Sequence, residues 1–178
     1  MVDPVTLRRA GFRTLFVAVA FAFVFVRILP FTGSPGGWPP PDLIVVLACA
    51  WVLRRPEYLP LWLIAGVALL ADVVFMRPLG LWALATVLGT EFLRRRSHLT
   101  LEQPFPVEWL LVASVLLAMH AGEALILLVT MVQQPGIGAT LLEYLTTVAV
   151  YPLAVVATAF VFGVRPPSPN QRDAEART

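Results

Sequence analysis

The sequence predicts an all-α polytopic membrane protein with six transmembrane helices, and two observations carry this prediction. First, hydrophobic residues make up 58% of the 178 residues and charged residues only 13%, whereas soluble domains carry about 25% charged residues. Second, the apolar residues fall into six runs, and the 13 basic residues, all of them arginine, mostly cluster at the ends of these runs. Arginines in such places are typical of topology signals and not of a groove for nucleic acid, so we expect no nucleic-acid partner.

The chain is long enough for one domain. We expect a single six-helix transmembrane domain over 1–164, followed by a disordered cytoplasmic tail over 165–178, because that tail is polar and rich in proline. The spans are expected at about 14–31, 42–53, 59–76, 79–93, 107–132 and 140–164.

The first apolar run follows Arg8, Arg9 and Arg13. A cleaved signal peptide or a twin-arginine signal is the alternative, but no small-residue cleavage site follows the run, and the chain beyond it is itself rich in apolar runs. We therefore expect a span. The segment 32–41 cannot be helical because it is dense in proline and glycine, and its Trp38 suits a loop at the outer membrane interface.

The second run begins at Asp42, a natural helix N-cap, and has only about 12 residues. A helix of this length measures roughly 18 Å, short for a hydrocarbon core of roughly 30 Å, so a re-entrant element is the alternative. The arginines favour a span, because only then do the clusters at 8–13, 54–55 and 94–96 fall on one side of the membrane. We expect a short span in a thinned or protein-shielded place, with both chain ends in the cytoplasm.

The third and fourth runs predict a tight helical hairpin that turns at Arg77 and Pro78. The three arginines 94–96 are expected to end its second helix, and Glu91 is expected to pair with the first two of them on the helix surface. Asp72 lies inside the first helix of the hairpin, where an ionised carboxylate is costly without a partner.

Five ionisable residues share one depth toward the outer leaflet when each helix is counted at about 1.5 Å per residue from its inner end. They are Arg27, Asp72, His120, Glu123 and Glu143. One interpretation is a structural ion-pair network, with Arg27 paired to Asp72 or Glu123. A second is a small polar cavity, open to the outer face, that holds a ligand or a partner's side chain. A third is that each side chain reaches the membrane interface separately.

No catalytic motif appears. The chain has no GxSxG, Walker, HExxH or paired-aspartate motif, so we expect neither an enzyme nor a cofactor. His120 and Glu123 share one helical face, but two ligands do not make a metal site, and a buried histidine with a satisfied ring is the expectation. Cys49 is the single cysteine, which excludes a disulfide within the chain.

Several short motifs follow one another in the segment 41–96. In chain order they are Pro41-Asp42 before a short apolar run, Trp51 and Arg54-Arg55-Pro56 at its end, a run with Gly66 that ends in Asp72, and Pro78-Leu79-Gly80-Leu81-Trp82 before a helix that closes in arginines. This series resembles the MreD family in its alphaproteobacterial form, the small integral-membrane subunits of the bacterial rod-shape machinery. One departure is the approach to the aspartate, where the glycine-rich pattern of the family is reduced to a single glycine.

The resemblance implies a non-enzymatic subunit of the elongation complex in the bacterial inner membrane. Proteins of this family bind the single-span periplasmic protein MreC, in a complex that also includes MreB filaments, the glycosyltransferase RodA and its partner transpeptidase. The implied role is to organise or regulate the synthesis of lateral-wall peptidoglycan, and hence cell shape. The family is also similar in outline to the substrate-capture subunits of energy-coupling-factor transporters, which implies a transport subunit as the alternative. A third hypothesis, an enzyme acting on a lipid-linked substrate, requires the polar layer itself to be catalytic.

For the partner we expect a face at the outer leaflet, formed by the interfacial loop and the hairpin corner. The residues expected there are Trp38, Asp42, Arg77, Pro78, Gly80 and Trp82. The inner arginine clusters are expected to set the topology and to contact anionic lipid.

Overall fold

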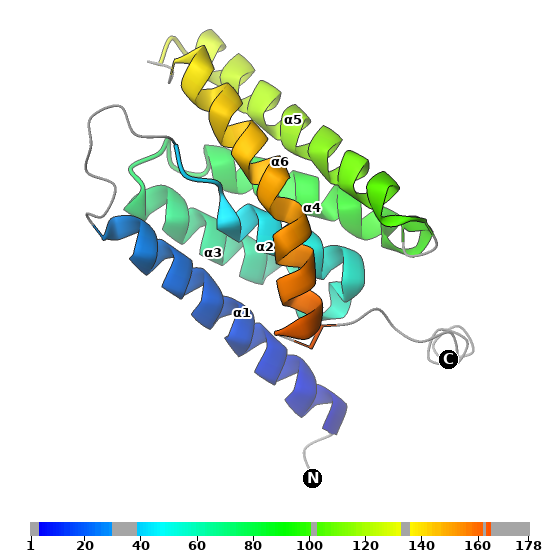
Figure 1. Ribbon diagram of the computed structural model, residues 1–178. Helices are drawn as coiled ribbons and strands as arrows, with labels where there is room; N and C mark the ends of the chain where they lie inside the picture. The colour runs from blue at the N-terminus through cyan, green and yellow to red at the C-terminus, as the bar shows by residue number, and fades with distance from the viewer. Residues whose placement is uncertain (1–3, 30–38, 101–102, 133–135, 162, 165–178) are drawn as a thin grey trace.

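The computed structural model describes residues 4–29, 39–100, 103–132, 136–161 and 163–164. Within them the chain forms six α-helices, one short 3-10 helix and no strand (Figure 1). The elements are α1 (Pro4–Ile28), α2 (Leu43–Arg54), η2 (Pro56–Tyr58), α3 (Leu61–Val74), α4 (Leu81–Thr100), α5 (Phe105–Val129) and α6 (Ile137–Phe160). The predicted all-helical class and the six helices are confirmed. The predicted loop around Trp38 and the predicted disordered tail lie outside the described residues.

Two helix boundaries differ clearly from the prediction. α1 begins at Pro4, well before the expected start at 14, because arginine is a good helix former and proline is tolerated at the first helical position. α4 continues through the arginines 94–96 to Thr100, so the prediction that they end the helix is wrong. Basic side chains near a helix C-terminus interact favourably with the helix dipole. In α1 and α4 the apolar runs therefore predicted the apolar part of the helix rather than the whole helix.

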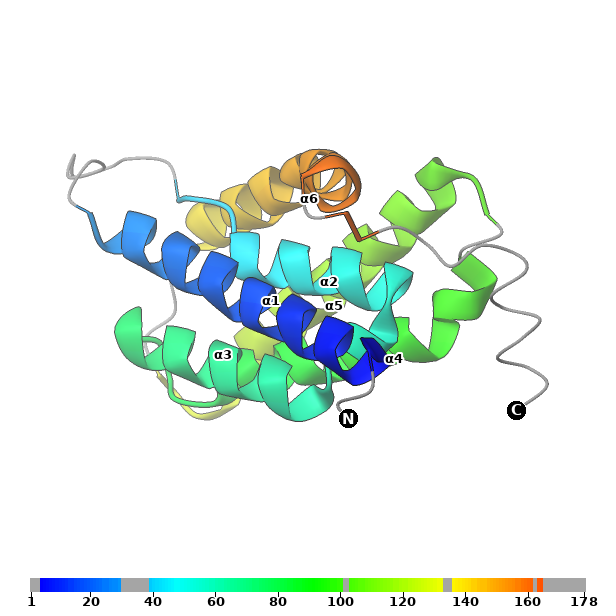
Figure 2. The same cartoon turned by 90° about the horizontal axis from the view of Figure 1, so that it is seen from below.

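α2 lies at the centre of the bundle, with the other helices around it (Figures 1 and 2). All its residues over 44–54 are buried. It packs most extensively against α4 and α6, and less extensively against α1 and η2. The short second run is therefore shielded by protein along its length.

Aromatic side chains fix α1 and η2 against the central helix. Trp51 of α2 is fully buried, and the ring centroids of Phe12 and Phe16 from α1 lie 6.2 and 5.6 Å from its own. Phe12 also stacks on Tyr58 of η2 at 4.4 Å. Such ring pairs contribute beyond the apolar area that they bury. Cys49 is buried in the same cluster as a free thiol.

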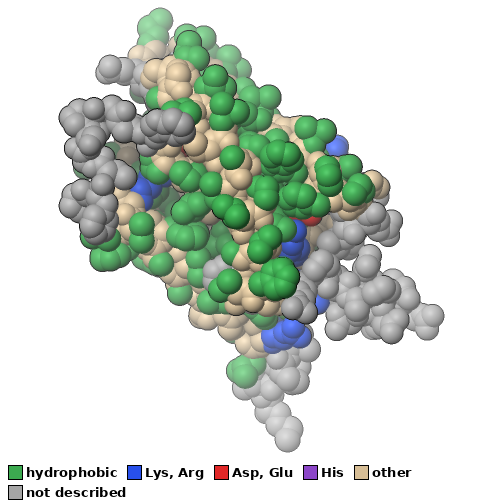
Figure 3. Space-filling view, viewed as in Figure 1, with side chains coloured by type: hydrophobic (Ala, Val, Ile, Leu, Met, Phe, Trp, Pro, Cys, Tyr) green, Lys and Arg blue, Asp and Glu red, His purple; other side chains and the backbone are tan. Residues whose placement is uncertain are grey.

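The outside of the bundle is apolar. Large hydrophobic side chains such as Phe25, Leu110 and Leu153 are exposed, and hydrophobic side chains cover much of the face seen in Figure 3. α5, α6 and the segment Thr6–Ile28 of α1 are long and apolar enough to cross a membrane, whereas α2 and α3 are apolar but have only 12 and 14 residues. Apolar surface and helix length together indicate a membrane protein.

Candidate functional site

Asp42 caps the N-terminus of α2 and is the centre of a polar cluster at this end of the bundle, which we call the Asp42 end. Its Oδ1 accepts a hydrogen bond from the backbone N–H of Val45 at 3.2 Å, as expected of an N-cap aspartate. Its Oδ2 accepts from the indole Nε1 of Trp82 at 2.9 Å and from the guanidinium of Arg77 at 3.0 Å. Both carboxylate oxygens are therefore satisfied within the protein.

Arg77, in the turn between α3 and α4, bridges two carboxylates. Its Nη1 donates to Asp42 at 3.0 Å, and its Nη2 donates to Oε1 of Glu143 on α6 at 2.9 Å. Its guanidinium also lies 5.3 Å from the ring centroid of Trp82. Burial lowers the pKa of Arg77, but the two carboxylates outweigh this effect, so the pKa lies above its ordinary value and the charge is retained. Arg77 therefore ties the turn to both α2 and α6.

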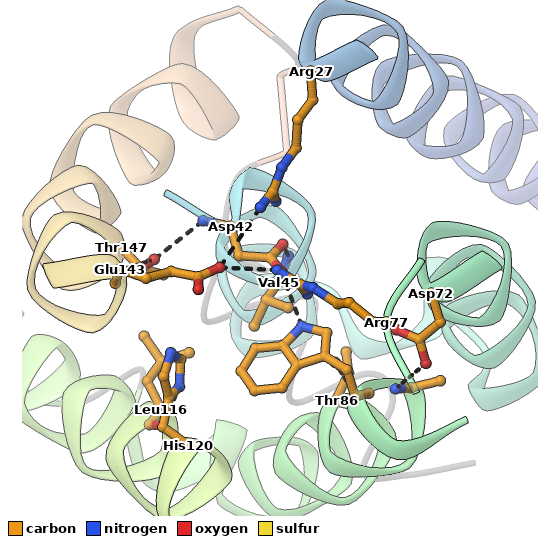
Figure 4. A network of polar contacts seen from close by, with 12 residues as sticks. Arg27, Asp42, Val45, Asp72, Arg77, Thr86, Leu116, His120, Glu143 and Thr147 are labelled. Atoms are coloured by element: carbon orange, nitrogen blue, oxygen red, sulfur yellow. Dashed lines mark hydrogen bonds and ion pairs between the residues drawn. The ribbon is translucent and has the colours of Figure 1, made fainter. Parts of the chain in front are cut away.

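Arg27, near the end of α1, reaches the same cluster from another side (Figure 4). Its Nη2 lies 3.8 Å from Oε1 of Glu143, and its guanidinium lies 4.4 Å from the ring centroid of Phe75. The predicted pairing of Arg27 with Asp72 or Glu123 is therefore wrong. Asp72 is turned toward the start of α4 and Glu123 lines a different part of the bundle, so the carboxylate within reach is that of Glu143.

We call Arg27, Asp42, Arg77 and Glu143 the arginine–carboxylate network. It joins α1, α2, the α3–α4 turn and α6 (Figure 4). A further bond supports it, since the backbone N–H of Asp42 donates to Oγ1 of Thr147 on α6 at 3.1 Å. The four side chains are between 4% and 25% exposed. Removing one member of such a buried set is costly, because a charge is left without compensation.

Asp72 lies apart from this network and caps α4. It is fully buried on α3, and its Oδ2 accepts hydrogen bonds from the backbone N–H groups of Gly80 and Ala83, both at 3.1 Å. These N–H groups stand at the start of α4, where a helix offers them no partner. Gly80 has a φ of +82°, which explains a glycine in this turn. The Oδ1 of Asp72 is buried, with no hydrogen-bond partner among the described residues.

The other two residues of the predicted polar layer also lie outside the network. His120 on α5 is buried, with its Nδ1 3.1 Å from the carbonyl oxygen of Leu116 and its ring edge-on to those of Trp82 and Tyr144. Its ring thus has a partner within its own helix. Glu123, one turn further along α5, lines a groove between α4 and α5. The five residues of the predicted layer are therefore distributed over several places and do not share one cavity.

The predicted partner face is partly turned into the protein. Asp42 and Trp82 are 3% and 4% exposed and are hydrogen-bonded to each other, so the prediction that they contact a partner directly is wrong. Arg77 is committed to two carboxylates. Pro78 remains exposed in the turn, and Trp38 lies outside the described residues.

A second buried cluster lies at the other end of α2, which we call the Arg54 end. The Nη1 of Arg54 donates to the carbonyl oxygen of Ala50 at 3.1 Å and to Oε1 of Glu108 on α5 at 3.0 Å. The hydroxyl of Tyr151 on α6 donates to the same carboxylate. Sequence reasoning missed this cluster, although Arg54 was expected at the inner end of its helix.

Arg94 on α4 fixes the segment that connects α2 and α3. Its guanidinium donates to the carbonyl oxygens of Pro56 and Leu59 at 2.7 and 2.5 Å. It also pairs with Glu91 at 3.0 Å, and Arg95 lies 3.5 Å from the same carboxylate. The predicted pairs of Glu91 are confirmed. Arg94 is in addition a structural residue, because it fastens α4 to the backbone of the α2–α3 connection.

The chemistry of these clusters is that of helix cross-linking. Within the described ranges no group of three His, Cys, Asp or Glu side chains is placed to hold a metal ion. The arginines and carboxylates are instead engaged with one another and with helix ends.

Comparison with known proteins found no match to a protein family, to a curated protein or to a solved structure. The relation to the MreD family therefore rests on the motifs within 41–96 and stays a prediction.

Proposed function

We propose that this chain is a non-enzymatic membrane subunit of the MreD type, which binds MreC and helps to organise or regulate lateral-wall peptidoglycan synthesis. MreB, RodA and its transpeptidase belong to the larger complex in this proposal. All six helices then cross the bacterial inner membrane, both chain ends lie in the cytoplasm, and the Asp42 end faces the periplasm.

The proposal is supported above all by the way in which the residues of the family resemblance contact one another. Asp42 accepts a hydrogen bond from Trp82, and Asp72 accepts one from the backbone of Gly80. These contacts link three of the four motifs that carry the resemblance into one unit. Side chains that hold helix ends in this way favour a scaffolding subunit, because they are not free to act on a substrate.

Copurification tests the proposal. The full chain and the MreC protein of the same organism are coexpressed and extracted in a gentle detergent. We expect the wild type to retain MreC. Arg77→Met, which loosens the hairpin from α2 and α6, is expected to retain less, whereas Arg95→Met, a change at an exposed arginine, retains as much as the wild type. A wild-type chain that does not associate with MreC contradicts the proposal.

Cysteine labelling tests the proposed topology. Single cysteines are introduced at Pro39, near the Asp42 end, and at Glu57, near the Arg54 end. The native Cys49 is buried and should not react. A membrane-impermeant maleimide applied from the periplasm is expected to label Pro39→Cys and to spare Glu57→Cys. The opposite labelling pattern would place the Asp42 end in the cytoplasm and contradict the proposed topology.

One observation favours the alternative of a substrate-capture subunit. The Oδ1 of Asp72 is buried with no partner among the described residues, and such an atom is a natural acceptor for a small polar ligand. Native mass spectrometry distinguishes the two functions. A small molecule that is retained by the wild type and lost in Asp72→Asn favours capture, and a wild type that carries none removes this alternative.

A further inference from the structure

An open apolar groove runs along the outside of the bundle between α4 and α5. Its volume is about 600 Å³, and it extends from Leu81 and Glu123 at the Asp42 end to Arg96 near the Arg54 end. At about 1.5 Å per residue, the stretch of α4 from Leu81 to Arg96 measures roughly 22 Å. The groove therefore follows most of a hydrocarbon core that is roughly 30 Å thick.

One wall of the groove carries a stripe of small side chains. Ser114, Ala118 and Gly122 follow one another at every fourth residue of α5. Ser114 and Ala118 line the groove, and a Cβ placed on Gly122 would meet no atom within 4 Å. Gly89 on α4 differs, because a Cβ there would come within 2.8 Å of Sδ of Met119, so this glycine serves the packing of α4 on α5. The space beside the α5 stripe is thus left for something outside the described chain, and small residues allow a helix backbone to approach closely.

A charge marks one end of the groove. The carboxylate of Glu123 lines it. Arg77 in the α3–α4 turn is near enough to act on this carboxylate electrostatically, but no described residue forms a hydrogen bond or an ion pair with it. In an apolar environment an acidic side chain requires a cation or a donor nearby. Arg77 is engaged with two other carboxylates, so an occupant with a basic group at the depth of Glu123 would complement this carboxylate directly.

Two other occupants fit less well. In a membrane, a second copy related by a twofold axis along the membrane normal would bring the two Glu123 side chains to the same depth, and like charges facing one another repel. The acyl chain of a phospholipid covers one leaflet, about half of the groove, and it offers no basic group to Glu123. An apolar helix that crosses both leaflets matches both the length and the charge.

We propose that the α4–α5 groove is the docking site for the transmembrane helix of a single-span partner, which places a small-residue face against Ser114, Ala118 and Gly122 and an arginine or lysine beside Glu123. This inference rests on the proposed function, since it supplies the site at which a membrane-anchored partner such as MreC binds. It moves the contact away from the turn around Arg77 and onto the lipid-facing side of the bundle.

Groove-filling variants test the site. Gly122→Leu places a large side chain in the groove, and its Cβ has open space, so the fold should tolerate it. Gly66→Leu is the matched control, because a Cβ placed on Gly66 would also meet no atom within 4 Å, and Gly66 lines a separate groove between α1 and α3. We expect Gly122→Leu to reduce the copurified MreC about tenfold or more and Gly66→Leu to leave it unchanged. Glu123→Gln, which keeps the shape of the side chain, is expected to reduce it severalfold.

Photo-crosslinking gives a second readout that does not depend on stability. A photoreactive phenylalanine analogue replaces Leu88, which is 62% exposed in the α4–α5 groove, or Trp62, which is 64% exposed in the α1–α3 groove. Crosslinks to the transmembrane segment of MreC are expected from Leu88 and not from Trp62.

The outcomes separate the two proposals. If the wild type does not retain MreC, the proposed function fails. If the wild type retains MreC but Gly122→Leu retains as much as Gly66→Leu, or if crosslinks form from Trp62 and not from Leu88, the docking site is wrong while the function stands.

Discussion

Arg77→Met is the most direct test of the arginine–carboxylate network, because it removes one charge and keeps most of the side-chain stem. Glu143 keeps Arg27 at 3.8 Å, and Asp42 keeps its neutral donors, but the Asp42 carboxylate, 4% exposed, loses the only cation hydrogen-bonded to it among the described residues and keeps Arg27 at longer range. Removing one partner of a buried ion pair costs about 3–5 kcal/mol. Because the side chains of Arg77 and Glu143 are 17% and 22% exposed, we expect the lower end, about 3 kcal/mol of unfolding free energy.

The native thiol provides the assay. Cys49 is fully buried in α2, so a fluorogenic maleimide reacts with it only when the detergent-solubilised protein unfolds on heating. At about 2–4 °C per kcal/mol for a chain of this length, the midpoint should fall by roughly 6–12 °C. The control is Arg95→Met, whose side chain is 80% exposed and whose loss should cost less than about 0.5 kcal/mol.

A double variant identifies the cause. Combining Arg77→Met with Asp42→Asn should recover at least about 1 kcal/mol relative to the sum of the single changes, because a neutral amide needs no counter-charge. An Arg77→Met midpoint indistinguishable from that of Arg95→Met refutes the reasoning, since the carboxylate would then not depend on the arginine.

Three further pairs of substitutions address other contacts in the same assay. Asp72→Ala removes the cap of α4 and should cost about 2 kcal/mol, more than Asp72→Asn, whose carbonyl can still accept both N–H groups; equal midpoints would contradict the capping role. Gly80→Ala should cost about 1 kcal/mol because of the positive φ, whereas Gly66→Ala, inside a helix with open space, should stabilise by up to about 1 kcal/mol. Tyr151→Phe should cost about 1 kcal/mol and Arg54→Met about 3 kcal/mol, since only Arg54→Met leaves the Glu108 carboxylate without a cation. A larger loss of stability in Tyr151→Phe than in Arg54→Met would contradict this account of the Arg54 end.

The helices were predictable because apolar runs and their breakers are local features of the sequence. The exceptions have one local cause and one long-range cause. α4 passes through the arginines 94–96 because those residues favour a helix and one of them has backbone partners across the bundle, which no count of apolar residues reveals. α1 extends toward the N-terminus because its arginines favour a helix as well.

The polar contacts were less predictable, since a residue count gives the depth of a side chain but not its direction around the helix. Arg27 and Glu143 were placed at one depth and do form an ion pair, whereas His120 and Glu123, placed at the same depth, form no hydrogen bond or ion pair with the network in the described structure. The central residue, Arg77, was assigned to the surface because it lies in a turn. Its position at the same end as an N-cap aspartate was the signal that could have identified it.

The length of α2 explains why charged clusters stand at both of its ends. A helix of 12 residues spans roughly 18 Å, so when it is buried throughout, neither of its ends reaches water across a core of roughly 30 Å. Its free N–H and C=O groups must then be satisfied by protein. Asp42 accepts the N–H of Val45 and takes Arg77 as its counter-charge, while Arg54 at the C-terminus donates to the carbonyl oxygen of Ala50 and takes Glu108. An acid at the N-terminus and a base at the C-terminus also match the helix dipole.

Both ion pairs are therefore consequences of placing a short helix at the centre of an apolar bundle. This gives a physical reason why most of the buried charges are structural, and why Glu123, which serves neither end of α2, is the one that we assign to a partner.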